Sequence, residues 1–202
     1  MRIKHYIYIF WTIIFLILSD VVRWPCGPEN IINIKDKSFK IFTLCTKIFT
    51  SLDFQLKYLY FSVHVRRTDY IKFVEKRYKG QEVGAQFFLD AIQELERSDP
   101  SSVFLVTSDD IEWCRQNILH PRVIFPSLSS QSDDPTVTDF ILLTQTNHSI
   151  YDYGSFAFWG AVLAGGKTIV ADGYSERLHP VLAAIKKFPP NHWKTRNVKT
   201  LK

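Results

Sequence analysis

The spacing of hydrophobic residues changes along this chain, and the changes define its predicted elements. From Tyr58 onward, short apolar runs alternate with segments in which apolar residues recur every three or four positions. Short apolar runs indicate buried strands, and the wider spacing indicates amphipathic helices. Strands are predicted at residues 58–63, 103–107, 122–125, 148–151 and 168–171, and helices at 85–95, 110–118, 138–145 and 155–164.

The order of these elements predicts the fold class. Strands that alternate with helices at this spacing indicate βαβ units and a parallel sheet. The expected fold is therefore α/β, a Rossmann-like parallel sheet with helices on both faces, over residues 58–202. Gly165 and Gly166 follow the last predicted helix and supply its left-handed stop. Residues 23–57 show no sustained period, and we predict a stem or the remnant of an upstream half there.

The N-terminal segment has a different pattern. Arg2 and Lys4 precede residues 6–19, which carry no charge and are almost entirely aliphatic and aromatic. This stretch is shorter than the roughly 20 residues of a typical membrane span and resembles the core of a signal peptide. A buried core helix is the alternative, but the apolar residues lie on all faces rather than in one stripe. We therefore predict a signal or signal-anchor segment at residues 1–22, with the membrane as its partner.

Composition narrows the class of partner. The 202 residues are 46% hydrophobic and carry a formal charge of +5, which excludes a disordered chain and favours an anionic ligand. No basic tract with interleaved aromatic residues is present, so nucleic acid is not expected. Cys26, Cys45 and Cys114 lack the paired spacing of zinc sites, and no metal site is predicted on them. Either Cys26 and Cys45 pair in an oxidising compartment or all three remain thiols.

The sequence HVRRTDY at residues 64–70 is the strongest candidate for chemistry. It follows the first predicted strand, and ligands of α/β sheets bind at strand exits. Arg66 and Arg67 offer forked donors suited to phosphate. The alternative is a solvated arginine pair bridged to Asp69.

Two later strand exits also carry polar groups with alternative interpretations. Asp109 and Asp110 after the second strand could hold a divalent metal, but the favoured interpretation is that Ser108 or Asp109 caps the next helix. Ser155 opens an apolar helix, where the free amides of the first turn and its hydroxyl either bind phosphate or simply cap the helix.

His148 lies within a glycosylation sequon that begins at Asn147. The sequon is usable only if this part of the chain is lumenal. No nucleophile or partner acid lies beside His148, so we interpret it as an ordinary strand-end histidine rather than a catalytic one.

Three stretches together resemble the α-1,2-fucosyltransferases: residues 64–70, 106–114 and 139–166, in order and in spacing. The resemblance implies membrane enzymes of the Golgi with type II topology and two Rossmann-like domains in a GT-B-like arrangement. It also implies transfer of L-fucose from GDP-fucose to the 2-hydroxyl of a terminal galactose on a glycan acceptor. Transfer would proceed with inversion and without a cofactor or a required metal.

The resemblance also implies roles for individual residues. His64 and Asp139 would approach the guanine. Arg66 would approach the β-phosphate, and Ser155 would approach the diphosphate. Arg67 and Phe156 are also assigned to this donor site. Arg66 would neutralise charge on the leaving GDP, and Arg67 would brace Asp69. Asp69 is the only candidate base inside the motif. The alternative is a structural role in which Asp69 holds the arginines.

The position of the motif departs from the family pattern. In the family the arginine motif falls in the latter half of the chain, whereas here it begins at His64. Residues 23–57 are fewer than the roughly 50 of a typical domain, so the N-terminal half is expected to be truncated. The two hypotheses are therefore an α-1,2-fucosyltransferase and a shortened relative that only binds GDP or GDP-fucose.

Overall fold

Six parallel strands form one sheet in the computed structural model, which describes residues 58–126 and 134–198. These residues belong to one compact unit of the chain, residues 45–202. The strands are β1 (Leu59–Val65), β2 (Ser102–Ser108), β3 (Val123–Ile124), β4 (His148–Tyr151), β5 (Thr168–Asp172) and β6 (Trp193–Asn197). They lie in the order β3-β2-β1-β4-β5-β6, and every pairing is parallel.

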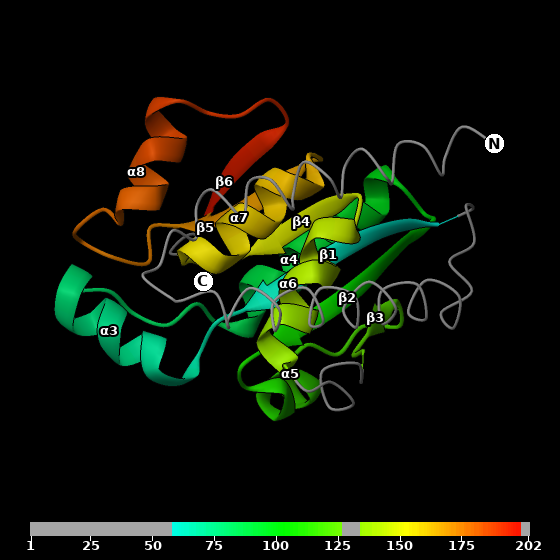
Figure 1. Cartoon of the computed structure of the whole chain (residues 1–202), viewed down its shortest axis with the longest axis horizontal. Coiled ribbons are helices and arrows are strands. Elements are labelled where there is room, and N and C mark those ends of the chain that lie inside the picture. The colour runs from blue at the N-terminus through cyan, green and yellow to red at the C-terminus, as the bar shows by residue number, and fades with distance from the viewer. Residues whose placement is uncertain (1–57, 127–133, 199–202) are drawn as a thin grey trace, which may run out of the picture. The chain divides into compact units, whose positions relative to one another are not determined.

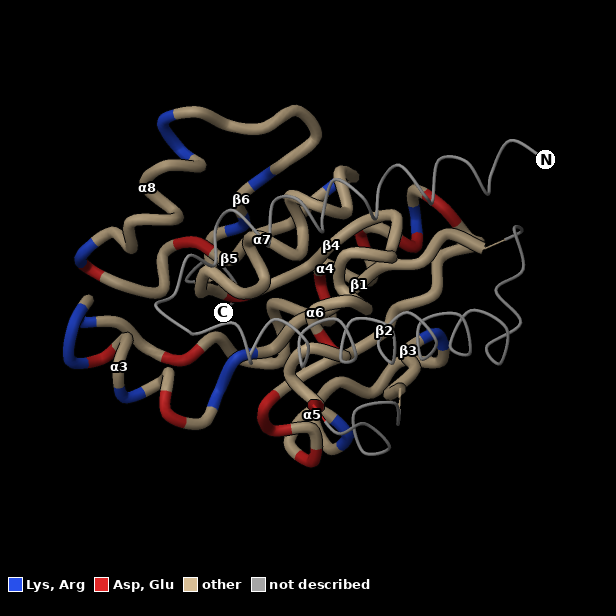
Figure 2. Tube along the Cα trace, in the orientation of Figure 1, with Lys and Arg blue, Asp and Glu red and all other residues tan. Residues whose placement is uncertain are grey.

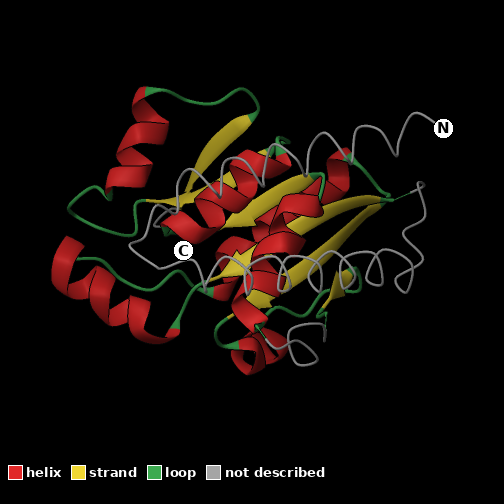
Figure 3. Cartoon of the chain, in the orientation of Figure 1, coloured by secondary structure: helices red, strands yellow, loops and turns green. Residues whose placement is uncertain are grey.

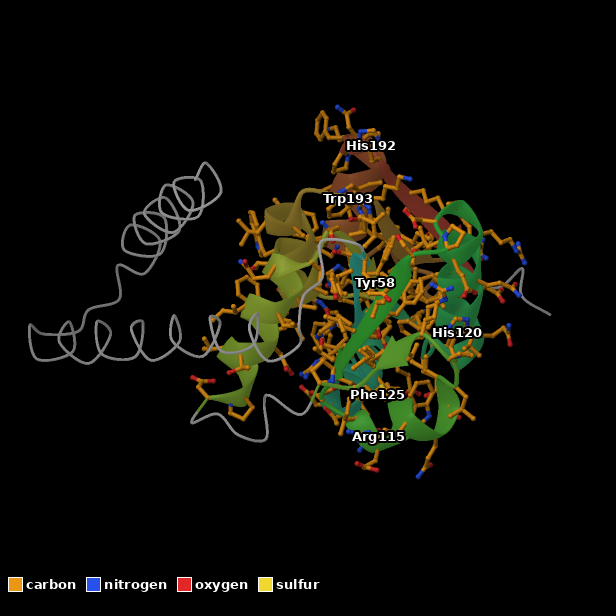
Figure 4. The ribbon with its side chains drawn as sticks, turned by 90° about the vertical axis from the view of Figure 1, so that its right-hand side faces the viewer. Tyr58, Arg115, His120, Phe125, His192 and Trp193 are labelled. Atoms are coloured by element: carbon orange, nitrogen blue, oxygen red, sulfur yellow. The ribbon has the colours of Figure 1, made fainter. Side chains whose placement is uncertain are left out.

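Helices cover both faces of the sheet (Figures 1 and 3). The described helices are α3 (Thr68–Tyr78), α4 (Ala85–Ser98), α5 (Ile111–Asn117), α6 (Pro135–Gln145), α7 (Ser155–Ala164) and α8 (Pro180–Lys187). The chain moves outward from β1 to β3 and then crosses back to β4 and moves outward to β6. Because such crossovers are right-handed, α4 and α5 lie on one face and α6, α7 and α8 on the other. Figure 4 shows α4 and α6 on opposite sides of the sheet.

The position of the site follows from the order of the strands. The winding direction reverses between β1 and β4, which are neighbours in the sheet. In sheets of this order, ligands bind outside the carboxyl ends of the strands at the reversal, the topological switch point. The loops that leave β1 and β4 therefore frame the expected site.

The core explains why the helices pack where they do. Phe87, Phe88 and Ile92 of α4 are buried in one cluster with Phe61 and Val63 of β1. On the opposite face, α6 and α7 pack closely, and a Cβ added at Gly160 of α7 would lie 2.8 Å from the Leu143 side chain. Glycine at this position therefore sets the spacing of the helix pair.

The predicted α/β class and the parallel sheet are confirmed, and each predicted strand and helix is present with small shifts at its ends. β1 runs to Val65, so His64 lies inside the strand rather than beyond it. Gly165 adopts the expected left-handed stop with φ 75°, and Cys114 is buried on α5.

The helices α3 and α8 and the strand β6 were not predicted. α3 buries only Val74 and carries charges of both signs (Figure 2), so it lacks an apolar stripe. The edge strand β6 is mostly polar and pairs through its backbone with β5.

The N-terminal predictions lie outside the described residues. These are the membrane-targeting segment at residues 1–22, the stem or remnant at 23–57, and the alternatives for Cys26 and Cys45. Within residues 58–126 and 134–198, no helix is long and apolar enough to span a bilayer.

Candidate functional site

The loop that leaves β1 is held at two consecutive main-chain N–H groups. The N–H of Arg66 donates to the Asp152 carboxylate at 2.8 Å, and the N–H of Arg67 donates to the Asp109 carboxylate at 2.8 Å. Asp152 directly follows β4, and Asp109 directly follows β2. The exits of three neighbouring strands are thus joined by hydrogen bonds around the arginine motif.

The Arg66 side chain is presented at the switch point between two carboxylates. Its Nη1 donates to Asp109 at 2.7 Å and its Nη2 donates to Asp69 at 2.6 Å. The Thr68 hydroxyl also bonds Asp109. The Arg66 side chain is 32% exposed, so a forked cation is fixed in orientation and remains accessible. This arrangement suits an anionic ligand such as a phosphate.

Arg67 occupies a different environment. Its side chain is 11% exposed, its Nη2 bonds Glu82 at 3.0 Å, and its Nε lies 3.6 Å from an Asp110 oxygen. The guanidinium carbon lies 3.6 Å from the ring centre of Trp113. The prediction that Arg67 braces Asp69 is wrong, because Arg66 makes that ion pair and Arg67 points into the α5 side of the domain. The alternative of a solvated arginine pair is also wrong for Arg67.

Asp69 lies in the first turn of α3 and its side chain is 76% exposed. Its carboxylate pairs with Arg66 and accepts from the Thr68 hydroxyl. This geometry is that of a group that orients Arg66. Its role as a base toward an acceptor stays a prediction.

A second group of predicted residues gathers between β1 and the helices α6 and α7. The His64 ring centre lies 5.2 Å from that of Phe156 on α7, which lies 5.2 Å from that of Phe140 on α6. Asp139 precedes Phe140 on that helix. The tertiary structure therefore brings His64 and Phe156 into contact and places the helix of Asp139 beside them.

Burial sets the charge of the two titratable residues in this group. Burial lowers the pKa of His64 to about 4, so its imidazole is neutral at pH 7. Burial raises the pKa of Asp139 to about 6, and no described residue donates a hydrogen bond to its carboxylate. The neutral imidazole of His64 and the carboxyl group of Asp139 are therefore the two titratable hydrogen-bonding groups at this position.

The start of α7 supplies main-chain donors at the exit of β4. Gly154 is the N-cap residue with φ 94°, Ser155 is the first helical residue, and no side chain of the described residues caps the helix. The alternative in which Ser155 caps α7 is therefore wrong. The uncapped amides of the first turn point out of the helix next to Arg66's loop, as in anion sites at helix N-termini.

In the Ser108-Asp109-Asp110 segment, the residue that caps the next helix differs from the prediction. Asp110, rather than Ser108 or Asp109, caps α5 by accepting from the Trp113 N–H at 3.2 Å. Ser108 accepts from the Asp110 N–H at 2.9 Å. Asp109 bonds the arginine motif instead. Within the described ranges, no group of three or more His, Cys, Asp or Glu side chains is arranged to hold a metal ion.

Asp152 is the site residue that sequence reasoning missed. It is buried, accepts from the Arg66 and Tyr153 N–H groups, and has its pKa raised to about 8 by burial. The sequence signal for Asp152 is an acidic residue directly after the apolar end of a strand, two residues before Gly154. Asp109 also directly follows the end of a strand.

The sequon and His148 lie at the other end of β4. The Asn147 side chain accepts from the Tyr60 N–H at 2.9 Å, and His148 Nδ1 accepts from the Lys167 N–H at 3.0 Å. The ring centre of His148 lies 4.6 Å from that of Phe61. His148 is thus the strand-end histidine that was predicted, with structural contacts.

The strand order and the polar loops at its switch point define a doubly wound α/β domain with a partly exposed arginine at the carboxyl edge of its sheet. A family model described as "Glycosyl transferase family 11" matches residues 46–187. The chain therefore belongs to glycosyl transferase family 11.

The curated relatives carry fucosyltransferase names. The chain is 40% identical over 112 residues to "Galactoside 2-alpha-L-fucosyltransferase SEC1" of Bos taurus, covering 54% of this chain and 30% of that protein. It is 38% identical over 130 residues to "Galactoside alpha-(1,2)-fucosyltransferase 1" of Sus scrofa, covering 63% of this chain and 34% of that protein. The chain thus spans about a third of the length of the curated relatives it matches.

The fold is also similar to that of a solved structure. It is the NodZ alpha-1,6-fucosyltransferase soaked with GDP-fucose, with a TM-score of 0.46 and 17% identity. The alignment covers 69% of this chain and 47% of that chain.

Proposed function

We propose that this chain binds GDP-fucose at the β1–β4 switch point and takes part in transfer of L-fucose to the 2-hydroxyl of a terminal galactose. The observation that carries this proposal is the fixed and accessible guanidinium of Arg66 beside the uncapped N-terminus of α7. Family membership and the names of the curated relatives support fucose as the transferred sugar and galactoside as the acceptor.

The proposed chemistry depends on stabilising a diphosphate leaving group. Arg66 would neutralise the charge that develops on the β-phosphate, and the first-turn amides at Ser155 would share it. Asp69 and Asp109 hold the guanidinium in place, so little reorganisation is needed as charge develops. The ion pair between Asp69 and Arg66 supports a role for Asp69 in positioning Arg66 rather than in abstracting a proton.

Proposed binding of the nucleoside uses the second group of residues. His64, Asp139 and Phe156 would surround the guanine, with the neutral imidazole and the carboxylate as hydrogen-bonding groups. Arg67 would act indirectly, by holding the loop against Trp113 and Glu82.

We further propose a Golgi membrane location with the domain in the lumen, through the segment at residues 1–22. The apolar stretch after Arg2 and Lys4 supports this topology. Protease protection of the full chain in sealed Golgi vesicles tests it, and digestion of the intact domain without detergent would contradict it.

Two measurements test the proposed function. Calorimetry of the full chain with GDP should show binding, and incubation with GDP-fucose and a β-galactoside should give a product with a new α-1,2 linkage by NMR. Absence of GDP binding by folded protein would contradict the proposal. Binding without transfer would support the shortened, non-catalytic relative instead.

A further inference from the structure

Three buried side chains with unsatisfied polar atoms lie in one row across the sheet. Thr107 Oγ1, His64 Nδ1 and Tyr151 Oη find no hydrogen-bond partner among the residues that the structure describes. Thr107 of β2 and Tyr151 of β4 are both paired in register with His64 of β1. Registered residues of neighbouring parallel strands lie about 4.8 Å apart and point to the same face. The row therefore crosses the switch point at the carboxyl ends of three strands.

These three side chains are almost completely buried. The exposed fractions are 4% for Thr107, 7% for His64 and 2% for Tyr151. A buried polar group without a partner destabilises a fold by about 1–3 kcal/mol. Two residues earlier on the same face, the buried hydroxyls of Ser62 and Ser149 satisfy each other with a hydrogen bond of 3.1 Å. A polar row at the ligand end of the sheet is therefore expected to meet a polar partner.

Tyr151 differs from the other two residues of this row. It lines a small cavity of about 10 Å³ together with Asp152, Tyr174 and His179. That is close to the volume that a single water molecule needs, and the lining offers polar partners. Thr107 and His64 do not line this cavity. These two residues are register partners on the side of the sheet covered by α6 and α7, where the His64 ring centre lies 5.2 Å from that of Phe156.

We propose that Thr107 is a specificity-determining residue that hydrogen-bonds the nucleobase of the donor next to His64. This inference rests on the proposed function, because it takes the ligand to be a guanine nucleotide. Guanine presents two adjacent acceptors, N7 and O6, on one edge. The Thr107 hydroxyl donates to one of them, and the neutral His64 imidazole donates to the other. Asp139, a carboxylate acceptor, meets the N–H groups on the opposite edge.

The test compares three variants of the full chain by calorimetry with GDP and by thermal unfolding without ligand. Thr107→Val removes the hydroxyl while keeping the shape, and we expect GDP affinity to fall about tenfold. Without ligand, this variant should unfold at the same temperature as the wild type or higher, because an unsatisfied hydroxyl is lost. Thr107→Ser keeps the hydroxyl and should bind GDP within about threefold of wild type.

Thr168→Val is the matched control, since Thr168 is a buried threonine whose hydroxyl donates to the Gly166 carbonyl at the far end of β5. This variant should keep GDP affinity and unfold at a lower temperature.

Two results would overturn the inference. GDP affinity of Thr107→Val equal to wild type would remove Thr107 from the site while leaving the proposed function intact. If Thr107→Val and Thr107→Ser both lost GDP affinity and both unfolded at a lower temperature, Thr107 would have a structural role only. Failure of the wild-type protein to bind GDP would instead contradict the proposed function.

Discussion

The main-chain N–H of Arg66 donates a 2.8 Å hydrogen bond to the buried Asp152 carboxylate, which joins the exits of β1 and β4 at the switch point. Asp152 lies two residues before Gly154, the N-cap of α7. The same carboxyl group accepts from the Tyr153 N–H, so it holds the loop that presents Arg66 beside the segment that leads into α7. Its removal should loosen two parts of the proposed phosphate site together.

Asp152 should make stability depend on pH. Its pKa is about 8 in the folded chain and about 3.9 when unfolded, so the folded state holds the proton more tightly. The stability of the wild type should then fall as pH rises from about 4 to about 8 and level off above that. Asp152→Asn keeps an acceptor for Arg66 but does not titrate, so its stability relative to wild type should increase across this range.

Urea unfolding at pH 5 and pH 8.5 measures the effect of Asp152. Asp152→Ala should lose about 1–3 kcal/mol at pH 5, because the Arg66 N–H loses its acceptor. A stability difference between wild type and Asp152→Asn that does not change with pH would contradict this account.

The two arginines should respond differently to substitution. Arg66→Ala should weaken GDP binding about 10- to 100-fold, through loss of charged hydrogen bonds to phosphate, and change stability by less than about 1 kcal/mol. Arg67→Ala should lose about 2–4 kcal/mol of stability, since it removes the partner of Glu82 and the stacking on Trp113. Calorimetry at a temperature where both variants are folded separates the effects. An equal or larger loss of GDP affinity for Arg67→Ala would reverse the assignment.

GDP affinity should fall at acid pH because of Asp139. Its pKa is about 6 in the free protein, and only the ionised carboxylate accepts from two guanine N–H groups. Affinity should therefore fall up to about tenfold per pH unit below pH 6. His64, with a pKa of about 4, does not titrate in this window. The terminal phosphate of GDP also titrates near pH 6, so titrations from pH 5 to 7.5 should show a shallower profile for Asp139→Asn than for wild type. A profile as steep as wild type would exclude Asp139 from the site.

The start of α7 should require glycine at position 154. Its φ of 94° is unfavourable for any side chain, although an added Cβ would meet only the Tyr70 ring at an ordinary 3.7 Å. Gly154→Ala should therefore lose about 1–3 kcal/mol through backbone strain. Gly84→Ala is the matched control, because Gly84 is also an N-cap, has φ −73°, and has no atom within 4 Å of an added Cβ. Urea unfolding should show the control unchanged or more stable, and equal losses would contradict the strain argument.

The hydrophobic pattern was sufficient for most of the fold and for part of the site. β4, α7 and the Gly165 stop are nearly determined by local sequence, because apolar spacing and a terminal glycine act within a few residues. The pattern failed for α3 and β6, whose positions depend on contacts with other segments. Gln81 donates to the Tyr174 carbonyl just after α3, and β6 pairs with β5 while Lys194 and Arg196 bond Glu94 of α4.

The sequence by itself determined the βαβ order and the chemical types at each strand exit: two arginines after β1, two acids after β2, and a glycine–serine helix start after β4. Only the tertiary structure decided which acid holds which arginine. Asp109 and Asp152 lie 42 and 86 residues from their main-chain partners in the motif, and parallel pairing around a switch point brings them together. Burial then separates the roles of Arg66 and Arg67 and sets the charge of His64, Asp139 and Asp152, because desolvation depends on surroundings that no local pattern specifies.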